Sequence, residues 1–91
     1  METKLKCLIH QGLCDGIVEI IQSPNDDTIA CRIGEYWFYF IIGSEYENLT
    51  PDEVYETFTK EELTELIVSA MIELDKMEIE YYEMFLKEKL T

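Results

Sequence analysis

The spacing of hydrophobic residues divides the chain into two halves of different character. In the first half, three short runs rich in β-branched or aromatic residues predict β-strands at residues 16–22, 28–33 and 36–42. Pro24 and its polar neighbours predict a turn at residues 23–27. Gly34 and Glu35 predict a tight connection between the second and third strands. We therefore expect a three-stranded antiparallel meander.

The third run, YWFYFII, is apolar at every position. A strand that is apolar on both faces is typical of a central strand or of one covered by helices. The second run alternates, with Ile29, Cys31 and Ile33 on one face and Ala30 and Arg32 on the other. This alternation predicts a strand with one buried face.

The second half carries two helix-start signals. Thr50 with Glu53, and Thr59 with Glu62, have the spacing of capping boxes, and Pro51 suits a first helical position. From Leu63 onward, apolar residues recur at helical spacing. One helix over residues 60–89 would be about 45 Å long, too long for a domain of this size. We therefore expect a break at residues 75–80.

These elements predict an α+β fold: a small three-stranded antiparallel sheet followed by two or three helices packed on one face. The 91 residues are expected to form a single domain. Within it, residues 1–15 would form a zinc knuckle, residues 16–42 the meander and residues 50–90 the helices.

The composition of the chain indicates the compartment in which the protein is expected. The longest apolar run has seven residues, too few to cross a bilayer, and the N-terminal residues lack the pattern of a secretory signal. We expect a cytoplasmic protein without membrane contact. In a reducing compartment the three cysteines are not expected to form structural disulfides.

Cys7, His10, Cys14 and Cys31 form a candidate metal site. The first three have the spacing C-x2-H-x3-C, and a Cys3His set is one of the standard structural zinc sites. A zinc ion would fasten the N-terminal segment to the second strand through Cys31. The alternative is that Cys31 is a small core residue and the other thiols are free.

No catalytic motif is present, so we do not expect an enzyme. A closed Cys3His site would leave no open coordination position for a catalytic water. A nucleophilic Cys–His pair that uses Cys7 or Cys14 is the enzymatic alternative.

The chain is strongly acidic, with a formal net charge of −13. Residues 43–91 contain fourteen acidic residues and four lysines, so most of the excess lies in the helical half. A phosphate backbone would be repelled, whereas a basic protein surface would be complementary. Same-face helical carboxylates lie about 5–6 Å apart, comparable with the charge spacing of a nucleic-acid strand. The candidate partner-binding residues are Glu61, Glu62, Glu65, Glu73, Asp75, Glu78, Glu80 and Glu83, with Tyr81 or Tyr82 as aromatic anchors.

In its small size, acidity, short sheet followed by helices, and CLIHQGLC segment with Cys31, the chain resembles small type II-A anti-CRISPR proteins, in particular a zinc-containing member. The resemblance covers overall character and no diagnostic motif. It implies a phage or mobile-element protein, active in the host cytoplasm, that acts as a DNA mimic. It would inhibit a type II CRISPR effector nuclease by docking on a basic surface, such as the recognition lobe, and blocking nucleic-acid loading.

The alternative is a mobile-element interaction module with no nucleic-acid-related target. In that case the tyrosine-rich segment EYYEMFLKEKL near the C-terminus could form a homodimer seam.

Overall fold

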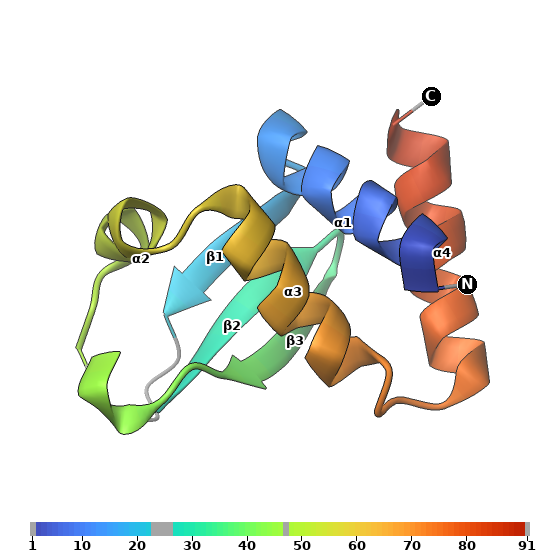
Figure 1. The fold of residues 1–91 in the computed structure, drawn as a ribbon. Coiled ribbons are helices and arrows are strands. Elements are labelled where there is room, and N and C mark those ends of the chain that lie inside the picture. Colours follow the sequence, from blue (N-terminus) through green and yellow to red (C-terminus); the bar gives the residue numbers. More distant parts are fainter. Residues whose placement is uncertain (1, 23–26, 47, 91) are drawn as a thin grey trace.

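The computed structural model describes residues 2–22, 27–46 and 48–90, which fold into a helical layer on a sheet (Figure 1). Their elements are α1 (Glu2–Asp15), β1 (Val18–Gln22), β2 (Thr28–Ile33), β3 (Tyr36–Ile41), a 3-10 turn (Ser44–Tyr46), α2 (Pro51–Thr57), α3 (Lys60–Met71) and α4 (Lys76–Leu90). The predicted α+β class is confirmed.

The three described strands form an antiparallel sheet in the order β1-β2-β3, which confirms the meander. The register places Cys31 of β2 between Ile20 of β1 and Phe38 of β3. Gly34 and Glu35 connect β2 to β3 as predicted, and Gly34 has a positive φ of 67°. The predicted turn at residues 23–27 falls mostly outside the described residues, which exclude 23–26.

The N-terminal segment, where we expected a zinc knuckle, is the α-helix α1. Leu5, Ile9 and Leu13 recur every four residues and are buried, so one face of the helix packs into the core. Gly12 permits close packing on β1, because a Cβ there would lie 2.7 Å from Val18 Cγ2. Apolar packing therefore attaches this segment. The helical pattern of α1 was not recognised in the sequence, because its apolar residues are few and stand among polar residues and Gly12.

Both predicted capping boxes are present. Thr50 accepts a hydrogen bond from the Glu53 backbone N–H, and the Glu53 side chain accepts one from the Thr50 backbone. Thr59 and Glu62 do the same at the start of α3. Two successive caps explain why the chain restarts its helix after Thr57 instead of continuing through residues 58–59.

The predicted break in the long helix is present, but it lies at residues 72–75, just ahead of most of the predicted range. The backbone N–H of Leu74 donates to Met71 O, and α4 restarts when Ile79 N–H donates to Asp75 O. The break allows α4 to fold back, so the described chain has a radius of gyration of 12.4 Å. Within the described ranges, none of the helices has the length and apolar character needed to cross a bilayer.

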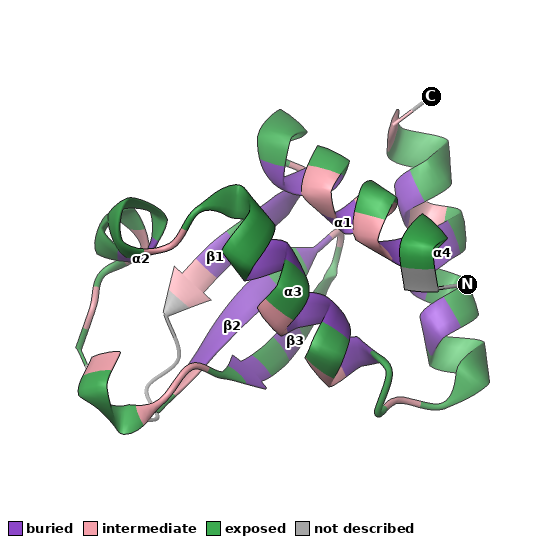
Figure 2. Ribbon diagram, viewed as in Figure 1, coloured by how far each residue is buried: buried purple, intermediate pink, exposed green. Residues whose placement is uncertain are grey.

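The helices cover one face of the sheet. α1 packs against both α3 and α4, and α3 also packs on β3 (Figure 1). Ile29, Cys31 and Ile33 of β2 are buried, whereas the outermost surfaces of the helices are exposed (Figure 2).

The other face of the sheet is uncovered in the described structure. Its side chains, which we call the open sheet face, alternate with the core residues and follow from the register: Glu19, Ile21, Thr28, Arg32, Trp37, Tyr39 and Ile41. Ala30 lies on the same side of β2 but is fully buried. The expectation that 36–42 is a central or helix-covered strand on both faces is therefore wrong. β3 is an edge strand, and Trp37, Tyr39 and Ile41 are 53%, 48% and 68% exposed.

Candidate functional site

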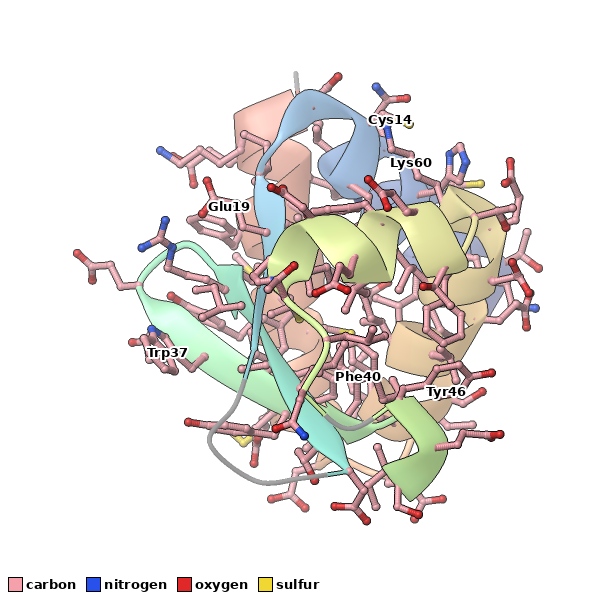
Figure 3. The ribbon with its side chains drawn as sticks, turned by 90° about the vertical axis from the view of Figure 1, so that its left-hand side faces the viewer. Cys14, Glu19, Trp37, Phe40, Tyr46 and Lys60 are labelled. Carbon is pink, nitrogen blue, oxygen red and sulfur yellow. The ribbon has the colours of Figure 1, made fainter. Side chains whose placement is uncertain are left out.

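Helix α1 carries three of the predicted metal ligands. Cys7, His10 and Cys14 are spaced i, i+3 and i+7, so the helix brings them to one side. Cys14 Sγ lies 4.0 Å from His10 Nδ1, and His10 Nε2 lies 3.4 Å from Glu61 Oε1 of α3. The pKa of Glu61 is lowered, first by a hydrogen bond from its own backbone N–H and then by the one with His10. Cys14 is visible at the outer edge of the molecule in Figure 3.

Cys31 is separated from this group by its burial. It faces the core from the middle of β2 and is fully buried, and the loss of solvation raises its pKa to about 12. In the absence of a metal it is therefore a protonated thiol that packs as a small core side chain. Within residues 2–22, 27–46 and 48–90, no three His, Cys, Asp or Glu side chains gather closely enough to hold a metal ion. In this conformation the residues do not fit a Cys3His site, and zinc stays a sequence-based prediction.

Three of the predicted partner-binding carboxylates have contacts inside the molecule. Glu61 meets His10, Glu62 caps α3 through Thr59, and Glu65 Oε1 lies 3.1 Å from Lys6 Nζ. All three are exposed on the first turns of α3. The contacts of Glu61 and Glu65 with α1 were not foreseen, because no pattern in the sequence indicated that residues 2–15 form a helix. The cap formed by Glu62 was predicted.

A different group of carboxylates has no such structural role. Within the described part of the chain, no salt bridge or hydrogen bond of their side chains is present, and all are exposed. They lie within eight residues, at the connection between α3 and α4 and on the first turns of α4 (Figure 1), and we call them the acidic corner: Glu73, Asp75, Glu78 and Glu80. Glu83, the last of the predicted set, is instead buried, and it lines a hollow together with Glu80, Lys4 and Lys87.

The acidic corner adjoins a hollow of about 290 Å³ lined by Tyr36, Glu78, Tyr81 and Tyr82, which we call the tyrosine hollow. Glu78, Tyr81 and Tyr82 are spaced i, i+3 and i+4 on α4, which places them on one side of the helix. Tyr36 comes from the start of β3.

The tyrosine rings of this hollow stand at steep angles to one another. The ring centroids of Tyr36 and Tyr81 are 5.1 Å apart at 80°, and those of Tyr81 and Tyr82 are 5.8 Å apart at 75°. Burial raises the pKa of Tyr81, with a smaller contribution from its hydrogen bond with Tyr36 and from nearby Glu35. Burial likewise raises the pKa of Tyr82. The phenols are therefore neutral at physiological pH and can donate or accept hydrogen bonds.

Tyr81 or Tyr82 was expected as an aromatic anchor, but Tyr36 was not. Its only sequence signal was that it opens a strand after the tight Gly34-Glu35 connection. The contact between the start of β3 and the start of α4 depends on how α4 folds back after residue 71. That packing cannot be derived from local patterns.

The open sheet face is the second exposed feature. Trp37 projects from the outer side of the sheet, whereas Phe40, on the opposite face of the same strand, points toward the helices (Figure 3). The charges of this face cancel, because Glu19 and Arg32 form a salt bridge across β1 and β2.

No protein-family model, curated protein or solved structure matches this chain.

Proposed function

We propose that this protein is a non-enzymatic, acidic inhibitor that binds a basic surface of a nucleic-acid-handling enzyme and blocks nucleic-acid loading. The target that we propose is a type II CRISPR effector nuclease, encountered in the host cytoplasm by a phage or mobile-element protein. The observation that carries the proposal is the acidic corner, four exposed carboxylates without a salt bridge among the described residues, in a chain of net charge −13.

The exposed carboxylates of the acidic corner have an electrostatic cost. Like charges without a salt-bridge partner repel one another and weaken the compact state. A basic partner surface relieves that repulsion, steers the encounter and adds specificity. Glu62 and Glu83 contribute less to this surface than we expected from the sequence, because one caps α3 and the other is buried.

The test is DNA cleavage by a purified, guide-loaded type II effector with increasing amounts of this protein. We expect inhibition that weakens as salt rises from about 50 to 500 mM, because screening shortens the range of charge interactions. The double reversal Glu73→Lys/Glu80→Lys should abolish inhibition. The matched control Glu45→Lys/Glu56→Lys changes the net charge equally at exposed positions far along the chain from the corner, and should leave most of it. Salt-insensitive absence of binding, with cleavage unaffected, would rule the function out.

A second candidate is an interaction module that pairs with another copy of itself. The open sheet face favours it, because it combines exposed Trp37, Tyr39 and Ile41 with charges that cancel in an otherwise acidic molecule. Two copies could meet there without placing like charges together. The C-terminal segment is less suited to a homodimer interface than expected, since Tyr82 and Leu86 are already buried within one copy of the chain. A dimer by light scattering, disrupted by Trp37→Lys and unchanged by Glu73→Lys/Glu80→Lys, would favour this candidate over the inhibitor.

A further inference from the structure

We propose that the tyrosine hollow is a binding site for one guanidinium group, supplied by an arginine side chain of the partner protein. The inference rests on the proposed function, since it names the partner group that the acidic corner would receive. It is carried by the geometry of Tyr36, Glu78, Tyr81 and Tyr82, which line the hollow together.

Three tyrosine rings line the hollow. Aromatic faces attract cations, and several rings set at steep angles around one hollow are the usual form of an organic-cation site. Here Tyr36 and Tyr81 meet at 80° and Tyr81 and Tyr82 at 75°. Tyr36 and Tyr81 are each about half exposed, so the hollow is open to a partner, whereas Tyr82 is 8% exposed and fixes its inner wall.

Two carboxylates give the hollow a negative charge. Glu78 lines the hollow, and Glu35 lies close enough to raise the pKa of Tyr81. Within the described residues no salt bridge neutralises either carboxylate, so the hollow is negative and is complementary to a cation. The phenol oxygens of the tyrosines add neutral acceptors for N–H groups.

Stacking and hydrogen-bond geometry favour a guanidinium over an ammonium group in the tyrosine hollow. An ammonium is a compact point charge that neither stacks on a ring nor forms two parallel hydrogen bonds with one carboxylate. A guanidinium is planar, stacks on aromatic rings and can form two parallel hydrogen bonds with one carboxylate. Arginine with part of its methylene stem therefore suits both the rings and Glu78.

The test uses the whole chain and a small probe. We expect N-acetyl-arginine amide to shift the ring resonances of Tyr36 and Tyr81 in a saturable way, with a Kd on the order of millimolar. The neutral isostere N-acetyl-citrulline amide should leave them in place, and N-acetyl-lysine amide should bind more weakly than the arginine probe. Glu78→Gln should raise the Kd about fivefold, whereas the control Glu56→Gln, at an exposed position of α2, should not. Equal shifts with the arginine and citrulline probes would overturn the inference.

A second readout is the titration of Tyr81, followed through its own ring resonances because the chain contains six tyrosines. A bound guanidinium favours the phenolate, so the arginine probe should lower the raised pKa of Tyr81, and the citrulline probe should not. The pKa of Tyr81 responds to a positive charge at the hollow, so a probe that binds there without a charge would leave it unchanged.

The outcomes separate this inference from the proposed function. If the arginine probe binds the hollow but the effector nuclease is not bound, this site stands as a guanidinium site and the proposed function fails. If Glu73→Lys/Glu80→Lys abolishes inhibition but the hollow does not distinguish arginine from citrulline, the proposed function stands and this inference fails.

Discussion

His10 of α1 and Glu61 of α3 lie in contact, with 3.4 Å between Nε2 and Oε1. The contact joins the N-terminal helix to the first turn of the helix beside it. It also explains why a histidine that looked like a metal ligand in the sequence has a partner without a metal.

This contact predicts an acid-dependent contribution to stability. The pKa of Glu61 is lowered from an ordinary value of 4.5, so its ionised form is favoured in the folded state. The stabilisation is present above pH 4.5 and is lost as pH falls through the lowered value. We expect Glu61→Gln to flatten the fall in melting temperature between about pH 5 and pH 3.

Two control variants separate the two causes of the lowered Glu61 pKa. His10→Ala removes only the smaller cause, the hydrogen bond with His10, and should flatten the acid-side fall in melting temperature less than Glu61→Gln does. Glu80→Gln removes an exposed carboxylate elsewhere and should leave that fall unchanged. If the melting temperature, measured by circular dichroism, falls equally with pH in Glu61→Gln and in the unmodified protein, the prediction is contradicted.

The three cysteines should differ in stability and reactivity. Cys31→Ser places a hydroxyl in the core and should lower the free energy of unfolding by about 2 kcal/mol, because the buried polar group lacks solvation. Cys7→Ser and Cys14→Ser change exposed positions and should stay within about 0.5 kcal/mol. Urea denaturation measures the differences. Alkylation should modify Cys7 and Cys14 in the native protein and reach Cys31 only after unfolding.

The same variants test the zinc prediction. Because Cys31 is buried in the core whereas Cys7 and Cys14 are exposed, we expect the metal content of the purified protein, measured by elemental analysis, to be the same with and without Cys31→Ser. One zinc per chain that is lost with Cys31→Ser would instead show that the thiol leaves the core to complete the four-residue site.

The second capping box should matter for stability. Thr59→Ala removes the acceptor for the Glu62 backbone N–H, and we expect it to cost about 1 kcal/mol. Thr59→Ser keeps the hydroxyl and should be close to neutral. The comparison by urea denaturation isolates the cap, and an equal loss in both variants would point to the methyl group of threonine instead.

Trp37 is the single tryptophan of the chain and reports directly on the open sheet face. With 53% of its surface exposed, it should emit at long wavelength and be quenched efficiently by acrylamide in dilute solution. A neutral quencher avoids repulsion by the acidic protein. Protection from acrylamide that grows with protein concentration would show that a second copy covers this face.

Local signals in the sequence were enough for several elements. The caps at Thr50 and Thr59 and the tight connection at Gly34 depend on side chains within a few residues, so they could be predicted. The meander followed from three short runs, because a strand needs only period-two patterning and a nearby turn. The break before α4 followed from length alone.

Tertiary structure decided what these elements face. YWFYFII is apolar throughout, and only the packing of the helices shows that one face is buried while Trp37 and Tyr39 remain exposed. Cys31 is a core residue because the helices cover its side of β2. The tyrosine hollow needs Tyr36 beside α4, although Tyr36 and Tyr81 are 45 positions apart in the sequence. The sequence by itself therefore determined the local elements and the acidity. Which apolar and acidic residues are exposed together depended on long-range packing, because burial is a property of contacts between segments distant in the chain.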